Sequence, residues 1–254
     1  MPVTLKGLFK KFIFYLPLKI INKIKEHNLY KKRLQFYANF IQEDDLCFDI
    51  GAHHGNRTEI FLKLGARVVA VDAQEDCTKF IGEKFPGNQK LILVNKGVAD
   101  VEGELPFYIC EKASTISTFS NDWKKKMSEE EIFSKYDWNK TKKVPVTTLD
   151  QLINTFGMPK FCKIDVEGFE LEVLKGLTQP IKYLSFEFQR LFLANLANCI
   201  NHIESLGSVV FNYSIAESME FVLPQWISAD ELYKEIESVK DNSFWGDVYI
   251  EFLM

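Results

Sequence analysis

Short apolar segments alternate with amphipathic ones along most of the chain. Apolar runs of strand length start at Leu46, Val68 and Phe161, and each ends in a polar or glycine-containing turn. Runs of this kind are typical of buried strands in a parallel sheet. Between them, apolar residues recur at helical spacing, as at Ile60 and Leu64. This alternation predicts an α/β fold: a mostly parallel sheet with helices on both faces and an antiparallel hairpin at one edge.

Turn residues set the boundaries of the predicted elements. Gly65 ends the helix that starts at Asn56, Pro86 and Gly87 end the next helix, and Asp150 is the predicted N-cap of a third. The predicted strands cover residues 46–50, 68–71, 91–94, 105–110, 144–149, 161–164, 183–189, 209–215 and 247–253. The predicted helices cover residues 56–65, 75–85, 150 onward, 170–176, 195–206 and 230–239.

Residues 1–45 are predicted to form a basic, helical N-terminal extension. Residues 1–26 hold six lysines against one acid, Glu26, and their apolar residues fall at helical spacing on both sides of Pro17. This pattern predicts two short amphipathic helices, followed by a further helix in 27–45. The longest apolar run, 12–18, is shorter than the ~20 residues of a membrane span. Residues 1–26 are therefore expected either to pack on protein or to lie peripherally on a membrane surface.

A glycine loop follows the first predicted strand. Gly51 and Gly55 bracket it, and glycine lets a ligand approach the main chain closely while the next helix directs free N–H groups toward it. Asp72 ends the second strand about 20 residues later, where a carboxylate accepts hydrogen bonds from ribose hydroxyls. The loop lacks the G-x-G-x-x-G pattern of dinucleotide sites, so it favours S-adenosylmethionine over NAD. The alternative is an ordinary strand–loop–helix connection.

A second polar segment follows the strand 161–164. Asp165 and Glu167 are two positions apart, so in extended backbone their side chains share a face. Carboxylates at the carboxyl end of a central strand lie where open α/β sheets bind ligands, and Glu187 of the next strand is expected to point into the same crevice. Such acids either hold a cation or leave one carboxylate as a general base, and both interpretations stay open. Glu170 is interpreted as first-turn helix charge.

Composition narrows the class of protein. The chain has 254 residues, 46% of them hydrophobic and 26% charged, which suits one α/β domain. A net charge of −4 and a pI of 5.7 provide no broad basic surface, so no nucleic-acid partner is expected. The five cysteines are widely spaced and form no C-x-x-C pair. They predict buried, reduced thiols in a cytoplasmic protein, with peripheral contact at the inner membrane face as the N-terminal alternative.

Residues 111–143 interrupt the apolar pattern with a polar, charged stretch. It carries scattered aromatic residues, including Trp123, Tyr136 and Trp138. Such an insertion inside a compact domain predicts a lid or binding loop, and the alternative is a solvated excursion whose aromatic residues anchor it. The turn 95–100 is predicted at the same sheet edge as Asp72, where it either flanks an adenine ring or only connects two elements.

Two blocks of residues resemble the FkbM-type family of class I S-adenosylmethionine-dependent methyltransferases. The blocks are 49–58 with Val71 and Asp72, and 144–150 with 163–170 and 173–176. The Lys-Ile-Asp-Val-Glu-Gly core at 163–168 is the most specific part. The resemblance implies a Rossmann-like, doubly wound, seven-stranded sheet within a methyltransferase domain at 46–254. It also implies O-methylation of a hydroxyl on a sugar, glycan or natural-product acceptor.

The resemblance also implies roles for individual residues. It places Asp49, Gly51 and Gly55 at the methionine end of the cofactor, Asp72 at its ribose, and Asp165 and Glu167 beside the transferred methyl group as catalytic residues. The cofactor-binding set as a whole is Asp49, Gly51, Ala52, His53, Gly55, Thr58, Asp72, Ala73, Gly97 and Val98. Asp165, Glu167 and Glu187 are the candidate ligands for Mg²⁺. The family usually has Asn where this chain has His53, and both His53 and His54 are expected to be solvated loop histidines.

Two other classes of protein compete with this interpretation. A nicotinamide oxidoreductase would share the sheet and Asp72, but the third glycine is missing and no Tyr-x-x-x-Lys pair follows a mid-sheet strand. The stronger alternative is a non-catalytic cofactor-binding or membrane-surface scaffold with the same fold, in which the basic N-terminus would be the functional part.

Overall fold

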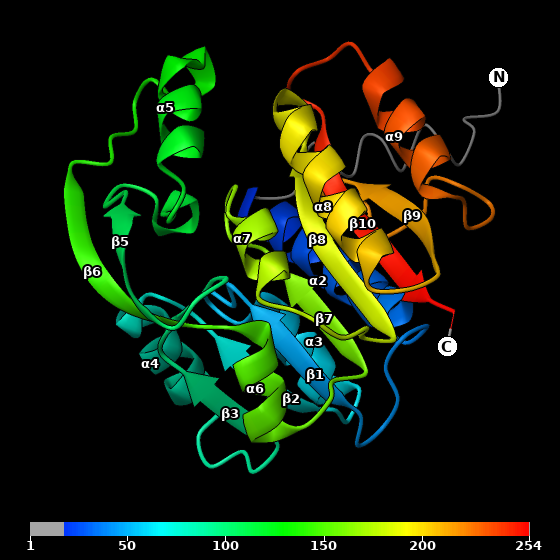
Figure 1. The fold of residues 1–254 in the computed structure, drawn as a ribbon. Helices are drawn as coiled ribbons and strands as arrows, with labels where there is room; N and C mark the ends of the chain where they lie inside the picture. Colours follow the sequence, from blue (N-terminus) through cyan, green and yellow to red (C-terminus); the bar gives the residue numbers. More distant parts are fainter. Residues whose placement is uncertain (1–17, 254) are drawn as a thin grey trace, which may run out of the picture.

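A seven-stranded, mostly parallel sheet forms the centre of the protein (Figure 1). The computed structural model describes residues 18–253. The strands follow the order β3-β2-β1-β7-β8-β10-β9. Their bounds are β1 (Leu46–Ile50), β2 (Arg67–Val71), β3 (Leu91–Val94), β7 (Phe161–Ile164), β8 (Tyr183–Gln189), β9 (Val209–Ile215) and β10 (Trp245–Phe252). β10 runs antiparallel to β8 and β9, and the other neighbours are parallel, which confirms the predicted fold class and edge hairpin.

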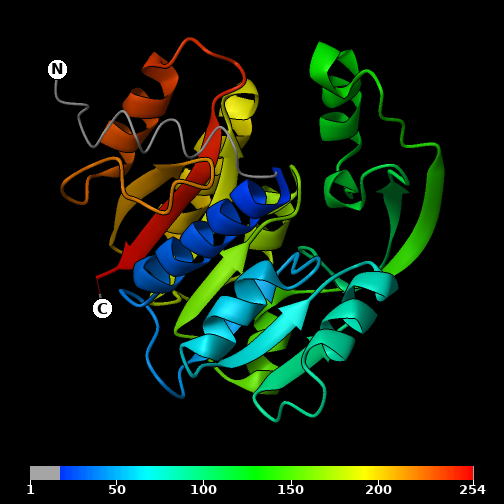
Figure 2. The ribbon, with the colours of Figure 1, turned by 180° about the vertical axis from the view of Figure 1, so that it is seen from behind.

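Helices cover both faces of this sheet. On one face lie α2 (Leu18–Tyr37), α3 (Asn56–Lys63) and α4 (Glu75–Lys84), which Figure 2 shows in front of the strands. On the other face lie α6 (Leu149–Phe156), α7 (Glu170–Lys175), α8 (Leu193–Ser205) and α9 (Ala229–Ser238), seen in front in Figure 1. Each layer has its own buried apolar cluster against the sheet. Two packed layers of this kind explain why the central strands are apolar on both faces.

The chain reverses its direction of travel across the sheet between β1 and β7. From β1 it winds outward through β2 to β3, and it later returns to place β7 on the other side of β1. β1 and β7 stay in register as far as Ile50 and Ile164. The loops that follow these two strands therefore start side by side, at the position where open α/β sheets bind their ligands.

A second, three-stranded sheet stands beside the carboxyl edge of the main one. It pairs β4 (Gly97–Val98), β6 (Lys140–Thr147) and β5 (Gly103–Ile109) in the order β4-β6-β5. The polar stretch between β5 and β6 holds η1 (Ser114–Ile116), α5 (Asn121–Glu129) and η2 (Glu131–Phe133), and η3 (Arg190–Phe192) follows β8. Trp123 and Trp138 are 1% and 8% exposed, so these aromatic residues anchor the insertion. The last residues of the predicted insertion, 140–143, belong to β6.

The N-terminal part differs from its prediction. The second of the two short helices and the helix predicted in 27–45 form one helix, α2, that ends at Tyr37. No glycine or proline occurs between residues 18 and 37, so nothing interrupts it. Phe36 and Phe40 are buried against the sheet. Residues 1–17 lie outside the described residues, and the domain boundary at 45 and the membrane contact stay predictions.

The N-cap predicted for α6 was also wrong. Thr148, and not Asp150, caps this helix, because the Thr148 side chain accepts a hydrogen bond from the Gln151 backbone N–H. The Asp150 carboxylate instead accepts from the backbone N–H of Thr178 at 3.0 Å and from its hydroxyl at 2.7 Å. A carboxylate one position inside a helix is free to bond another segment, and here it ties α6 to the chain after α7.

In residues 18–253, no helix is both long enough and apolar enough to cross a membrane. All five cysteines are free and buried, which confirms the predicted buried thiols.

Candidate active site

The loop after β1 passes directly against the end of β7. Gly51 has a φ of 82°, and a Cβ added there would lie 1.8 Å from the Asp165 carbonyl oxygen. Only glycine fits such an approach in the left-handed region. Gly55 has a φ of 71° and occupies the N-cap position of α3. The loop therefore runs close to the acidic segment, with the start of a helix behind it.

Asp72 lies at the end of β2 beside this loop. Its carboxylate accepts hydrogen bonds from the backbone N–H groups of His53, at 2.8 Å, and Gln74, at 2.7 Å. Burial raises the pKa of Asp72 to about 6, although these two hydrogen bonds oppose the shift. The carboxylate is held in place by the main chain and keeps acceptor capacity, since each of its oxygens has further lone pairs.

His53 is not the solvated loop residue that the sequence predicted. Its Nε2 lies 2.9 Å from the Ser114 hydroxyl, and its ring stacks on that of His54 at 3.8 Å. Burial, with a contribution from His54, lowers the pKa of His53 to about 4. Its φ of 47° lies in the left-handed region, which His and Asn adopt more readily than most residues. His54 is exposed, as predicted.

Three carboxylates meet at the carboxyl ends of β7 and β8. Asp165, Glu167 and Glu187 each offer an oxygen within 4.8 Å of the others. Burial and the neighbouring carboxylates Asp165 and Glu170 raise the pKa of Glu167, and burial and Glu167 raise that of Glu187. Carboxylates this close cannot all ionise unless positive charge is near, so this group tends to hold a proton or to attract a cation.

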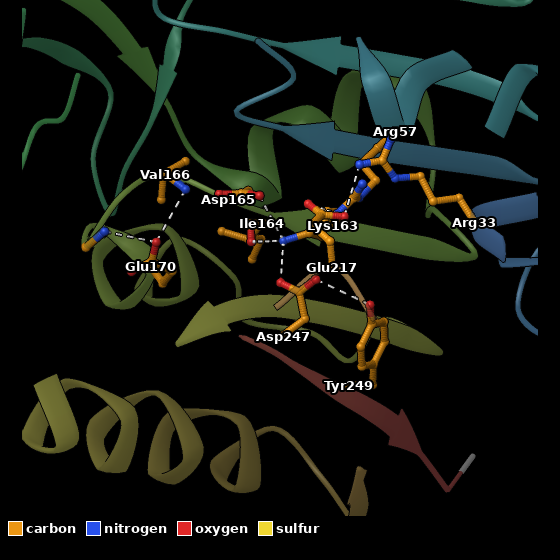
Figure 3. Close-up of polar contacts among 11 residues, drawn as sticks. Arg33, Arg57, Lys163, Ile164, Asp165, Val166, Glu170, Glu217, Asp247 and Tyr249 are labelled. Atoms are coloured by element: carbon orange, nitrogen blue, oxygen red, sulfur yellow. Dashed lines mark hydrogen bonds and ion pairs between the residues drawn. The ribbon is translucent and has the colours of Figure 1, made fainter. Parts of the chain in front are cut away.

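The backbone around Glu167 is held in place from two sides. Glu167 has a φ of 55°, and its carbonyl oxygen accepts a hydrogen bond from the buried Thr118 hydroxyl at 2.7 Å. Glu170 accepts from the backbone N–H groups of Gly168, at 3.1 Å, and Val166, at 3.3 Å (Figure 3). Burial raises the pKa of Glu170 to about 7. Glu170 thus closes the loop 165–169, a role that goes beyond the first-turn charge predicted for it.

Lys163 lies buried beneath the acidic segment. Its Nζ is 2.8 Å from Asp247 Oδ1 on β10 and 3.2 Å from Asp165 Oδ2 (Figure 3). Burial alone would lower the pKa of Lys163, but the two carboxylates raise it. The Tyr249 hydroxyl donates to the second Asp247 oxygen at 3.3 Å. One buried cation therefore joins the loop that starts at Asp165 to the antiparallel edge of the sheet.

A crevice over the ends of β1, β2 and β7 gathers most of the predicted site. Its lining includes the predicted residues Gly51, His53, Asp72, Ala73, Gly97, Val98, Asp165 and Glu167. Ser114, Ser117 and Phe119 of the insertion close it from the other side. The free volume is about 60 Å³, less than the roughly 300 Å³ of a ligand-sized pocket. A nucleoside would therefore need a wider crevice than this one.

A second cavity, of about 190 Å³, adjoins the crevice at the glycine loop. Asp49 and Ala52 line it, together with Gly51, His53, Asp165 and Glu167, which also line the crevice. Arg33 of α2 and Arg57 of α3 lie at its edge, where their Nη2 atoms contact Glu217 at 3.0 and 2.9 Å (Figure 3). Neither arginine was singled out from the sequence, because Glu217 joins them only in the folded chain.

Two predicted cofactor residues lie behind the loop. Gly55 and Thr58 line neither cavity in the described chain. The Thr58 hydroxyl donates to buried Asp49 at 2.5 Å. Burial raises the pKa of Asp49, and the Thr58 hydrogen bond opposes this shift. The geometry gives Gly55 and Thr58 a supporting position, with their direct contact to a cofactor left as a prediction.

A comparison with protein families decides the class. The model of the methyltransferase FkbM domain matches residues 49–200, more than half of the chain. The chain belongs to the FkbM methyltransferase family. As a family member it is an S-adenosylmethionine-dependent methyltransferase. The matched range contains both the glycine loop and the acidic segment, and all residues that line the crevice fall within it.

Solved structures of methyltransferases are similar to this FkbM protein only distantly. The precorrin-6y C5,15-methyltransferase from Geobacter metallireducens is 10% identical, with 88% of this chain and 86% of that chain covered at a TM-score of 0.46. A putative rRNA methylase from Clostridium thermocellum is 10% identical, with 87% and 93% covered at 0.44. A putative methyltransferase from Streptococcus mutans, in complex with SAH, is 13% identical, with 87% and 95% covered at 0.41. No curated protein matches the chain.

Proposed function

We propose that this FkbM protein transfers the methyl group of S-adenosylmethionine to a hydroxyl oxygen of a small acceptor, such as a sugar, a glycan or a natural-product scaffold. One observation carries the proposal. Glu167 lines the crevice beside Asp72 and also lines a separate, larger cavity that contains Glu187. A carboxylate between a cofactor pocket and an acceptor pocket is positioned to contact the reacting atoms of both.

The cofactor would lie along the crevice. Asp72 would accept hydrogen bonds from its ribose hydroxyls, and Gly97 and Val98 would flank its adenine. The residues Gly51, His53 and Asp49 would surround its methionine end. The half-buried imidazole of His53, whose pKa is lowered to about 4, can donate or accept there, depending on its tautomer.

The reaction makes limited demands on the protein. S-adenosylmethionine supplies a methyl group on a sulfonium centre and leaves as S-adenosylhomocysteine. The protein must hold the acceptor oxygen in line with that methyl group and receive its proton. The Glu167 carboxylate takes the hydroxyl proton as the oxygen–carbon bond forms and the carbon–sulfur bond breaks with its electron pair on sulfur. Burial and the neighbouring carboxylates raise the pKa of Glu167, and the positive charge of a bound sulfonium would favour its ionised, basic form.

A divalent cation is the alternative use of the same three acids. Asp165, Glu167 and Glu187 would hold it, and it would lower the pKa of the acceptor hydroxyl. Asp165 already has a cationic partner in Lys163. Within residues 18–253, Glu167 and Glu187 form no ion pair, which favours a proton shared between them over a metal.

Cofactor binding provides the first test. We expect S-adenosylmethionine and S-adenosylhomocysteine, but not NAD, to raise the melting temperature of the protein. A ligand at ~100 times its dissociation constant adds roughly 2.7 kcal/mol to the free energy of unfolding. Asp72→Ala should abolish this shift, and Asp76→Ala, which removes an exposed carboxylate from the first turn of α4, should keep it. Failure of both adenosyl ligands to stabilise the wild type would refute the proposal and favour the non-catalytic scaffold.

The affinity for S-adenosylhomocysteine should depend on pH through Asp72. The free protein has an Asp72 pKa of about 6, and ribose hydroxyls donate to the ionised form, so the complex has a lower pKa. Affinity should therefore be highest above pH 7 and fall by up to about tenfold per unit below pH 6. Calorimetric titrations from pH 5 to 8 measure this, and Asp72→Asn should flatten the profile. An equally steep profile in that variant would assign the proton to another group.

A further inference from the structure

A cavity of about 750 Å³ lies between two parts of the protein. The insertion forms one wall, and the carboxyl end of β8 together with residues 242–245 forms the other. Figure 1 shows α5 of the insertion facing this end of the sheet across the molecule. The lining residues are Ile116, Met127, Glu130, Glu131, Phe133, Glu167, Glu187, Gln189, Leu191, Asn242, Ser243, Phe244 and Trp245. Its volume falls in the range of small-molecule binding sites.

The cavity reaches the reaction centre through Glu167. This residue also lines the crevice beside Asp72, and Glu187 offers an oxygen within 4.8 Å of it. The Thr118 hydroxyl holds the Glu167 backbone in place through its 2.7 Å hydrogen bond to the Glu167 carbonyl oxygen. A molecule seated in the cavity can therefore present a hydroxyl to Glu167 from the side opposite the crevice.

The charge of the cavity is one-sided. Four of its lining residues are glutamates, and among the lining residues, all within the described range, there is no lysine, arginine or histidine. The ion pairs found in residues 18–253 include none of these four side chains. Lys124 of α5 is directed elsewhere, with its Nζ 4.0 Å from the Tyr108 ring centroid. A cavity lined by one sign of charge repels ligands of the same sign.

The remaining lining combines aromatic surface with amide groups. Phe133, Phe244 and Trp245 supply rings, and Trp245 is 39% exposed. The Gln189 Oε1 accepts from Trp123 Nε1 at 3.1 Å, which orients its amide N–H₂ group to donate. Rings flanked by carboxylates and amides suit a compound with an apolar face and several hydroxyl or amino groups.

We infer that this cavity is the acceptor site and that it selects a positively charged, amino-bearing polyhydroxylated acceptor over an anionic one. The inference rests on the proposed function, since it takes Glu167 as the residue between cofactor and acceptor. Acceptors that carry a phosphate or carboxylate near Glu130 and Glu131 bind more weakly because of charge repulsion, and a neutral acceptor binds with intermediate affinity.

Three matched probes test the preference: the 4-nitrophenyl β-glycosides of glucosamine, glucose and glucuronic acid, titrated by NMR into protein saturated with S-adenosylhomocysteine. We expect the glucosaminide to bind about tenfold more tightly than the glucuronide, with the glucoside between them. Glu130→Gln/Glu131→Gln should bring the three affinities together. Glu129→Gln removes an exposed neighbouring carboxylate that does not line the cavity, so it should leave the order unchanged.

Equal or tighter binding of the glucuronide would overturn the inference, and so would a preference that the double variant leaves intact. Failure of all three probes to bind at millimolar concentration would exclude the cavity as the acceptor site. The affinity of the wild type for S-adenosylhomocysteine is measured separately. If the wild type does not bind this cofactor product, the proposed function fails; if it does bind and the probes do not follow the expected order, only the acceptor inference fails.

Discussion

Replacement of Lys163 by methionine is expected to lower the free energy of unfolding by about 3–5 kcal/mol, because it leaves a buried carboxylate without its cation. The Lys163 side chain is fully buried, and Asp247, 2.8 Å away, is 6% exposed. Among the side chains of residues 18–253, Asp247 would keep only the Tyr249 hydroxyl, at 3.3 Å, as a hydrogen-bond partner. Urea denaturation of the two proteins measures the difference.

A double variant separates the charge effect from simple loss of packing. Lys163→Met/Asp247→Leu removes both members of the buried pair, and apolar replacements of similar size are often neutral. We expect it to recover most of the stability that Lys163→Met loses. A double variant as unstable as the single one would mean that Lys163 acts through packing, and a single variant within about 1 kcal/mol of the wild type would refute the buried-pair account.

The sequence predicted the sheet well because its signal is local. Each central strand is an apolar run between turn residues, so its position can be read within a few residues. Lys163 was visible as a charge inside such a run, at 161–164, but its partner Asp247 is 84 positions away. Nothing in the local pattern of Lys163 specifies which strand of the folded sheet supplies that partner.

The predictions that were wrong failed for a similar physical reason. The prediction that His53 is solvated was wrong because Ser114, 61 positions later in the chain, contacts its ring in the folded protein. Thr148 and Asp150 are both acceptable N-caps by residue type, and the choice depends on Thr178, which bonds Asp150 only in the folded protein. Interactions between distant segments decided these details, whereas the fold class needed only the alternation of apolar and amphipathic segments.

The same limit applies to the candidate site. Glycines and acids at strand ends indicated the crevice, since parallel strands place their carboxyl ends together. The large cavity beside Glu187 had no such signal, because it forms between the polar insertion and residues 242–245, and neither segment carries a motif. Its lining could be identified only from the structure.

Replacement of Glu167 by glutamine should reduce kcat by about 10²–10⁴, the usual contribution of a general base, while leaving the affinity for S-adenosylhomocysteine nearly unchanged. The amide keeps the size of the side chain but cannot take the acceptor proton at neutral pH. The Thr118 hydrogen bond goes to the Glu167 backbone oxygen, so the loop itself should be preserved. Product formation under saturating cofactor, together with calorimetric binding, measures both quantities. Glu172→Gln, on the helix α7 that follows the Glu167 loop and paired with Lys175, is the matched control.

The result also distinguishes a base from a metal ligand. If Glu167 takes the proton, a chelator should leave the wild-type rate unchanged, and raising the pH should not restore the variant. If the three acids instead hold a cation, chelation should remove activity and Mg²⁺ should restore it. A Glu167→Gln variant with near wild-type kcat would refute both roles. Transfer would then depend on positioning alone, with Asp165 as the remaining acid at the junction, because Lys163 fixes its carboxylate beside the crevice.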